Sequence, residues 1–466
     1  MVRSTGGRPG TAGWGPREWR GLGGAVLVGV AGLLGLGVFV ALVPAAAAAG
    51  DLLPVSVVLA AAVAALTVPS ATAVAAQAAE DSPAGNGYVD VSRRLGLPLG
   101  HLAGWASVVG RTTGSTALAL GVGGYLWPEG RTAVGIVAAL LVLALCLAGL
   151  TRSVRSAGVV VAAVLLVLMA VVLAMLLAPP EVLSPLPDPE THPGPVGVVR
   201  AAGLMYLGFV GASRVALLHD RVVDPARTLV RAVWISTAVT VVITLAVTLS
   251  ITSTVGAEWL AARAAPVAEA AEITGWPWLG AVVRVVAAVA LTGSLLALLP
   301  EMSRTVVTMA RDGLLPRPLG RADRQGRPVT ALLVISMSVV VLTLLLGVQD
   351  AIGVSSFCLL VGAGLVHTSA LGLTRGLRRA VPAAGLVGCV VLALALPWTT
   401  VLAGVVVLFL GAFVGWFRHT TRESPGAGGD GDPADEGVAG DGTVTADGSD
   451  PDDDEEEVGG HGGAAR

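Results

Sequence analysis

Charged residues are scarce in this chain, and lysine is missing altogether. Only 13% of the 466 residues are charged, and all 29 basic residues are arginines. A soluble domain of this length needs roughly twice that charged fraction to cover its surface. The shortage of charge therefore excludes a soluble protein, and the 54% of hydrophobic residues indicates a membrane protein.

Cysteine and reactive motifs are equally sparse. Cys146, Cys358 and Cys389 stand alone in apolar runs, without disulfide or metal-binding spacing, and are predicted to be packing residues. The six histidines are scattered, and the chain has no phosphate-binding loop, dinucleotide fingerprint or nucleophile elbow. We expect no enzyme activity, no metal and no cofactor, and the net charge of −3 gives no reason to expect nucleic-acid binding.

What the chain does have is long apolar runs. About 20 apolar residues make one membrane-crossing helix, and on that measure the sequence predicts twelve. The expected fold is an all-α polytopic membrane protein embedded in a lipid bilayer. The predicted helices span residues 22–44, 52–76, 97–127, 132–150, 157–178, 196–219, 229–254, 277–310, 328–347, 351–374, 380–396 and 398–417.

The placement of the arginines predicts the orientation. If both termini lie in the cytosol, the cytosolic segments hold 22 arginines and the outer loops only three, Arg131, Arg200 and Arg263. Loops rich in arginine stay on the cytosolic side of a membrane. We therefore expect an even number of helices, with the N- and C-termini in the cytosol.

The C-terminal tail has a different composition. From Thr421 onward it holds 14 acidic residues and two arginines, and near its end lies a run of six acids, Asp452 to Glu457. Such a segment cannot bury enough apolar surface to fold. Residues 421–466 are predicted to be a disordered cytosolic tail, either a solvated segment or a regulatory binding segment.

Glycines interrupt the first and sixth predicted helices at matching positions. The first contains Gly35 and Gly37, and the sixth contains Gly203, Gly208 and Gly211. Helices 1–5 and 6–10 occupy similar lengths of chain, and an odd number of helices in each half makes the halves inverted. Glycines also let membrane helices pack closely, but a matched pair of interrupted helices favours a transporter binding site.

A broken helix has a direct chemical use. Backbone N–H and C=O groups freed within a membrane are too costly unless they line a cavity or bind something. The N-terminal end of a half-helix suits a carboxylate, and freed carbonyl groups suit an ammonium group or a cation.

Several short motifs occur in a characteristic order and together resemble one family. They are Gly35-Leu36-Gly37-Val38-Phe39, Ala84–Val89 followed by Arg93-Arg94-Leu95-Gly96, Tyr206–Gly211, Asp224-Pro225-Ala226-Arg227, and Ser303-Arg304 followed by Met309–Pro316. Over roughly residues 20–420 the chain resembles the amino acid permeases of the amino acid–polyamine–organocation (APC) superfamily.

The resemblance implies a leucine-transporter-like fold of two inverted five-helix repeats, with helices 1 and 6 broken. It implies a secondary active transporter in the cell membrane that moves amino acids or related small amines by alternating access. The corresponding segments are a cytosolic N-terminal segment (1–21), the two repeats (22–178 and 196–374), helices 11 and 12 (380–417), and the tail (421–466).

The resemblance also implies where the substrate binds. Its carboxylate would meet the backbone around Gly35, Leu36 and Gly37, and its amine and side chain would meet helix 6. Arg111 stands where the family often has an aromatic residue close to the substrate. The full set of expected substrate-binding residues is Gly35, Leu36, Gly37, Val38, Tyr206, Gly208, Phe209, Gly211 and Arg111.

The chain departs from the family where coupling is concerned. Some members carry a lysine in helix 5 that takes part in proton coupling, but residues 164–169 here contain no ionisable group. In related sodium-coupled transporters, helix 8 hydroxyls and helix 1 carbonyls bind sodium. Thr292 and Ser294 lie near that depth, although helix hydroxyls commonly bond to their own backbone. We expect coupling to Na⁺, with H⁺, exchange or facilitation as alternatives.

Three arginines fall within predicted helices, where each costs about 2.5–3.5 kcal/mol unless it faces a cavity, a partner or an interface. Arg214 and Arg284 lie nearer helix ends and are expected to reach the membrane surface. Arg111 lies deeper, and it either binds an acidic substrate or pairs with a carboxylate. Glu301 is expected to form a local ion pair with Arg304, and His367 to be a packed residue rather than a proton relay.

A second function remains compatible with these residues. A receptor or scaffold derived from a transporter would bind a ligand without moving it and would signal through the acidic tail.

The composition of the tail makes a first prediction. Truncation after Arg422 removes no apolar surface, so membrane insertion should be unchanged and transport should stay within a few-fold of the full chain. Insertion is measured from the membrane-fraction yield and transport from uptake into vesicles. A truncated protein that no longer inserts would show that the tail takes part in the fold.

Overall fold

The computed structural model describes residues 22–78, 87–150, 154–178, 194–210, 225–323 and 326–420. These residues belong to one compact unit, Met1–Glu423, and their regular elements are helices. The predicted N-terminal segment (1–21) and acidic tail (421–466) lie outside the described residues.

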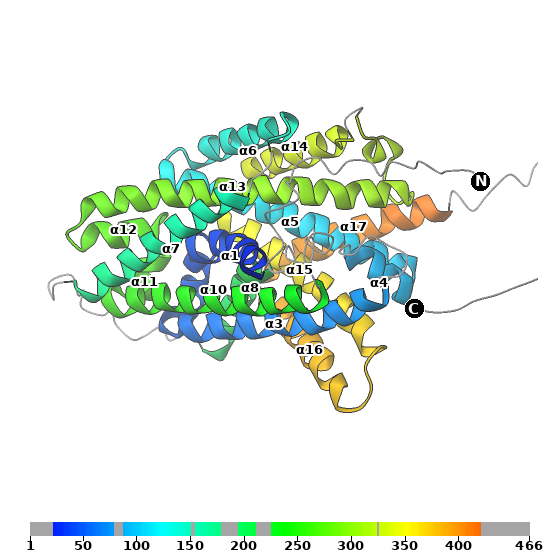
Figure 1. Ribbon diagram of the computed structural model, residues 1–466, viewed down its shortest axis with the longest axis horizontal. Coiled ribbons are helices and arrows are strands. Elements are labelled where there is room, and N and C mark those ends of the chain that lie inside the picture. The colour runs from blue at the N-terminus through cyan, green and yellow to red at the C-terminus, as the bar shows by residue number, and fades with distance from the viewer. Residues whose placement is uncertain are drawn as a thin grey trace, which may run out of the picture. The chain divides into compact units, whose positions relative to one another are not determined.

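The helices follow one another along the chain as labelled in Figure 1. They are α1 (Leu22–Phe39), α2 (Leu42–Ala49), α3 (Leu53–Ala78), α4 (Gly87–Leu95), α5 (Leu97–Leu126), α6 (Arg131–Leu147), α7 (Val154–Leu176), α8 (Pro195–Phe209), α10 (Pro225–Val255), α11 (Ala257–Ala261), α12 (Pro266–Ile273), α13 (Pro277–Arg311), α14 (Val329–Leu345), α15 (Val348–Leu371), α16 (Ala380–Ala395) and α17 (Trp398–Thr420).

Each of the twelve predicted ranges overlaps a helix of the structure, and the first covers α1 and the start of α2. Within the described residues, eight helical stretches are long and apolar enough to cross a membrane, and α6, α8 and α14 are shorter apolar helices. The all-helical membrane fold is therefore confirmed. The count of twelve crossings and the inverted repeat stay predictions.

The helix ends follow ordinary backbone rules. Proline occupies the first turn of α5, α8 and α13, where its missing N–H would have no helical partner in any case. Gly96 separates α4 from α5 with a φ of 88°, and Gly256 separates α10 from α11 with a φ of 87°. Glycine adopts this left-handed conformation without the steric cost that other residues meet.

Helix α5 lies against many of the others, including α6, α13, α14, α15 and α17. Hydrogen bonds anchor it at several levels. Ser355 of α15 donates to the Gly110 carbonyl (2.5 Å), and Trp105 donates to the Val407 carbonyl of α17 (3.0 Å). Every residue from Thr112 to Tyr125 is buried, so this half of α5 packs against protein rather than lipid.

The first predicted helix is broken, but later than its glycines suggest. Gly35 and Gly37 lie inside α1, and the interruption falls at Val40 and Ala41, whose amides both donate to the Leu36 carbonyl (3.3 and 3.0 Å). Pro44 explains this position, because proline has no N–H for the carbonyl four residues earlier, that of Val40. The α1 helix therefore ends at Phe39 and α2 starts anew at Leu42.

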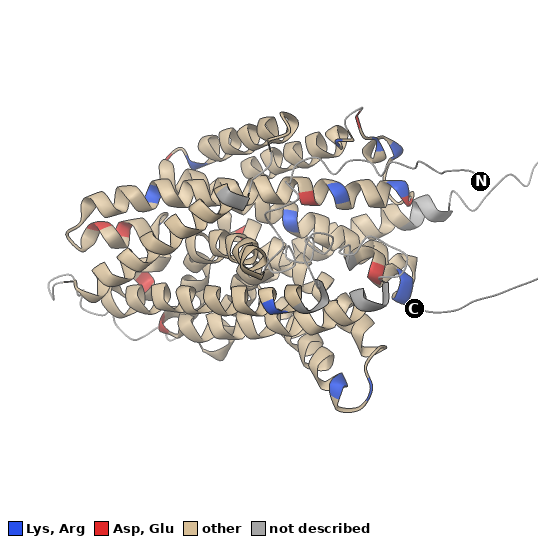
Figure 2. Ribbon diagram, in the orientation of Figure 1, with Lys and Arg blue, Asp and Glu red and all other residues tan. Residues whose placement is uncertain are grey.

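Charged residues are concentrated toward the ends of the helices. Figure 2 shows acidic residues on α11 and α12 and arginines near α4 and on the last turns of α13, with some residues of the opposite sign at both ends. The orientation of the termini stays a prediction.

Candidate functional site

Helices α1 and α8 touch backbone to backbone at two glycines. A Cβ atom built on Gly208 would lie 2.6 Å from the Cα atom of Gly37, and one built on Gly37 would lie 3.5 Å from the Cα atom of Gly208. Residues with larger side chains could not approach so closely. The structure thus brings together two residues that the sequence singled out in different halves of the chain.

Most other predicted substrate residues lie next to this contact. Leu36 and Val38 flank Gly37 on α1. On α8, Phe209 follows Gly208 and Tyr206 lies two residues before it, and all four side chains are buried. Helix α8 ends at Phe209, and residues 211–219 of the sixth predicted helix lie outside the described residues. Gly211 and Arg214 lie outside the described residues.

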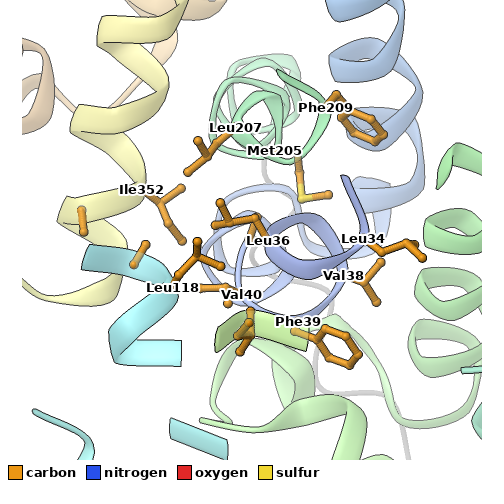
Figure 3. Packing of buried hydrophobic residues seen from close by; sticks show 14 of the residues in the cluster. Leu34, Leu36, Val38, Phe39, Val40, Leu118, Met205, Leu207, Phe209 and Ile352 are labelled. Carbon is orange, nitrogen blue, oxygen red and sulfur yellow. The ribbon is translucent and has the colours of Figure 1, made fainter. Parts of the chain in front are cut away.

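A group of buried apolar side chains lies around the contact. Figure 3 shows Leu36 of α1 among Leu207 of α8, Leu118 of α5 and Ile352 of α15. Met205, Phe209 and Leu34 also belong to this buried cluster. A ligand that meets this cluster would meet hydrocarbon on its side-chain face, so polar recognition there falls to the backbone at the helix ends.

The predicted ion-binding residues lie on α13, and one of them faces α1. A Cβ atom built on Gly35 would lie 2.6 Å from the Ser294 Oγ atom. Ser294 is 2% exposed, and its hydroxyl has no hydrogen-bond partner in the described part of the chain. A buried hydroxyl without a partner is costly. Thr292 is half-buried on the same helix.

Arg111 pairs with a carboxylate within the described residues. Its Nη1 atom lies 3.1 Å from the Glu301 Oε1 atom of α13, and the two side chains are 19% and 9% exposed. Of the two roles that the sequence left open for Arg111, the structure shows the ion pair. The expected local pair of Glu301 with Arg304 is wrong, because Arg304 is exposed and Glu301 reaches across to α5 instead.

Arg284 also has partners. Its Nε atom lies 3.0 Å from the Glu272 Oε1 atom of α12, and its Nη1 donates to the Tyr125 carbonyl (3.4 Å). We expected Arg284 only to reach the membrane surface, and its ion pair with Glu272 was not predicted. A charged side chain within a membrane needs a partner. Arg111 and Arg284, the two arginines within the described helices for which this was in question, each pair with a carboxylate.

Sequence reasoning overlooked a row of hydroxyls on α10. Thr240, Thr244 and Thr248 are buried at four-residue intervals, which places them on one face of the helix, and their hydroxyls have no partner among the described residues. The repeated spacing was visible in the sequence, but each threonine alone resembles an ordinary helix residue that bonds to its own backbone.

Comparison with known proteins decides the family. The profile described as amino acid permease matches residues 24–433. The chain belongs to the amino acid permease family. The resemblance that the motifs indicated is therefore confirmed.

Individual relatives agree with this family. An uncharacterized transporter of Mycobacterium tuberculosis (strain H37Rv) is 41% identical over 409 residues, which cover 86% of this chain and 91% of the relative. The branched-chain amino acid permease BcaP of Bacillus subtilis is 24% identical over 321 residues, or 63% of this chain and 67% of the relative. BcaP of Lactococcus lactis subsp. cremoris is 26% identical over 31% of each chain. This permease is thus a multi-pass membrane transporter and not an enzyme.

The glycine contact predicts an asymmetry between two matched variants. Gly208→Ala places a methyl group 2.6 Å from the backbone of Gly37, so the helices must separate, whereas the methyl of Gly37→Ala makes an ordinary 3.5 Å contact. Overpacking of this kind costs about 1–3 kcal/mol. We expect Gly208→Ala to lower the thermal unfolding midpoint and uptake much more than Gly37→Ala does. Equal effects would mean that α1 and α8 do not meet at these glycines.

The ion pair predicts non-additive substitutions. Arg111→Gln or Glu301→Gln leaves a buried charge without its partner, which destabilises a protein by about 3–5 kcal/mol. The double variant removes both charges, so its thermal unfolding midpoint in detergent should return toward that of the wild type. A double variant as unstable as the sum of the two single ones would rule out energetic coupling between Arg111 and Glu301.

Proposed function

We propose that this permease carries amino acids with aliphatic side chains across the cell membrane by alternating access, with both termini in the cytosol. The observation that carries the proposal is the contact of α1 with α8 beside a group of buried apolar side chains around Leu36 (Figure 3). A transported aliphatic side chain gains by leaving water for such surroundings, at about 25 cal/mol for each Å² of apolar surface.

The ends of the broken helix supply the polar half of recognition. Helix α2 begins at Leu42. The first N–H groups of a helix have no carbonyl partner within it, so those of α2 suit the substrate carboxylate. The last carbonyls of α1, at Gly37 to Phe39, suit the substrate ammonium group or a cation. A zwitterionic amino acid satisfies both ends without a charged side chain from the protein.

The names of two relatives favour the same substrate class. BcaP of B. subtilis and of L. lactis are branched-chain amino acid permeases. The side chains of branched-chain amino acids are aliphatic, as the apolar residues around Leu36 and Leu207 require. We extend this substrate class to the present chain because the apolar group supports it independently.

We further propose that the carrier is coupled to sodium. Ser294 Oγ lies beside Gly35 at the last turns of α1, where the helix ends in carbonyl groups, and neutral oxygens suit a hard cation such as Na⁺. The fifth predicted helix, α7, has an apolar run from Val159 to Leu176 with no ionisable residue, so it offers no group for the lysine-dependent proton route.

Uptake into liposomes tests both parts of this proposal. Purified protein should accumulate labelled leucine when sodium is higher outside, and unlabelled isoleucine and valine should compete while glutamate and arginine should not. Ser294→Ala should weaken the sodium dependence by tenfold or more. Ser336→Ala is the matched control, because Ser336 is another buried hydroxyl without a partner in the described residues, on α14.

The other outcomes are distinct. Uptake that ignores sodium but follows an imposed proton gradient would overturn sodium coupling. Leucine that binds but never accumulates would favour a receptor over a carrier. Competition by acidic or basic amino acids would overturn the aliphatic substrate class.

A further inference from the structure

A buried histidine lies at the centre of a polar network that the transport proposal does not use. His367 of α15 is 0% exposed, and both nitrogens of its ring have partners. Its Nδ1 atom lies 2.9 Å from Ser70 Oγ and its Nε2 atom 3.3 Å from Thr67 Oγ1, both on α3. A buried imidazole with two satisfied nitrogens has a fixed ring orientation.

The network continues to a predicted substrate residue. The hydroxyl of Tyr206, on α8, is directed toward Thr67 and Cys389, and Tyr206 is 2% exposed. Thr67 therefore stands between His367 and Tyr206. Helices α3, α8, α15 and α16 are mutual neighbours at this level, so the network joins four segments that lie far apart in the chain.

The hydrogen bonds can run in either of two directions. In the first, Ser70 Oγ donates to the Leu66 carbonyl (3.4 Å), His367 Nδ1–H donates to Ser70, and Thr67 donates to Nε2. In the second, Thr67 Oγ1 donates to the Val63 carbonyl (3.4 Å), His367 Nε2–H donates to Thr67, and Ser70 donates to Nδ1. In both, Thr67 can accept a hydrogen bond from the Tyr206 hydroxyl, and the chain of bonds ends on a backbone carbonyl.

A glycine on α16 makes room for the imidazole. A Cβ atom built on Gly385 would lie 2.1 Å from the Cε1 atom of His367 and 2.5 Å from its Nε2 atom. The ring is therefore held by contact on one side and by two hydrogen bonds on the other. Neither the family motifs nor the substrate-site residues account for this arrangement.

We propose that His367 is a positioning residue that acts on the substrate through Tyr206. By fixing Thr67, it holds the Tyr206 hydroxyl against α3 and so sets the position of α8, whose opposite face contacts α1 at Gly208. The role rests on the proposed function, because Tyr206 matters to transport only if α8 meets the substrate.

Single substitutions distinguish a positioning role of His367 in substrate binding from a role in protein stability alone. Loss of one hydrogen bond corresponds to roughly two- to tenfold in an equilibrium constant. We expect Thr67→Val and His367→Asn to raise the KM for leucine uptake by that factor, with the maximal rate per inserted molecule within about twofold. His367→Gln, whose amide can reach Thr67 from the Nε2 position, should restore part of the affinity. Thr368→Val is the control, because the Thr368 hydroxyl bonds only to its own helix, at the Gly364 carbonyl (2.8 Å).

A pair of glycine substitutions provides a second route. Gly385→Ala forces the imidazole out of its place, whereas Gly364→Ala, at the same interface of α15 with α16, puts a methyl group at an ordinary 3.6 Å from Leu386. Only Gly385→Ala should raise the KM. Equal KM values for the two variants would contradict the role of the ring position.

A double-mutant cycle shows whether His367 and Tyr206 are coupled. In thermal unfolding of the purified protein, which needs no substrate, His367→Asn and Tyr206→Phe should be less than additive. Additive effects would rule out the network. Coupling in unfolding with an unchanged KM for a transporting protein would make the network purely structural and overturn the positioning role. If the wild-type protein fails to take up leucine, the proposed substrate class is wrong. The double-mutant cycle in thermal unfolding still tests the hydrogen-bond network in that case.

Discussion

The contact between Gly37 and Gly208 determines what the rest of the site can be. Two glycines let the backbones of α1 and α8 meet without side chains between them. The contact brings the C-terminal end of α1 and the C-terminal end of α8 to the same place within the apolar group around Leu36. A larger residue at Gly208 would force the two helices apart at this point.

Arg111 and Arg284 show how a membrane protein accommodates charged side chains within its helices. Arg111 and Arg284 each pair with a carboxylate from another helix, Glu301 and Glu272. A pair is close to neutral as a whole, so it avoids most of the cost of a lone charge in the membrane. These pairs join α5 to α13 and α12 to α13, and they leave the group around Leu36 without a charged side chain.

The sequence predicted the helices well because twenty apolar residues have few other structures open to them in a membrane. It also singled out Gly37 and Gly208. It placed the break of the first helix too early, since it weighed the glycines above Pro44, whose missing N–H acts on a carbonyl four residues back. It paired Glu301 with the nearest arginine in the sequence, whereas the actual partner, Arg111, is brought in by the packing of α5 on α13.

Partners that lie far apart in the sequence account for the other gaps. Ser70 and His367 are separated by 297 residues, and no local pattern links them. The Ser294 hydroxyl, which has no partner among the described residues, is equally hard to predict from the sequence, because a serine in a helix usually bonds to its own backbone. Such groups become recognisable only when burial and the neighbouring helices are known.

The polar groups of the site then support a particular kind of substrate. They are helix ends and hydroxyls, namely the amides of α2, the last carbonyls of α1 and Ser294 Oγ, and they carry partial charges rather than full ones. A substrate with a net charge would enter the apolar group without a countercharge, because Arg111 is already paired with Glu301. A zwitterion with an aliphatic side chain carries no net charge and fills the apolar group. A coupling cation would add one positive charge, which the carbonyl end of α1 is suited to offset. The same physical constraint, a site that is low in charge because it lies within a membrane, thus supports both the substrate class and the choice of sodium.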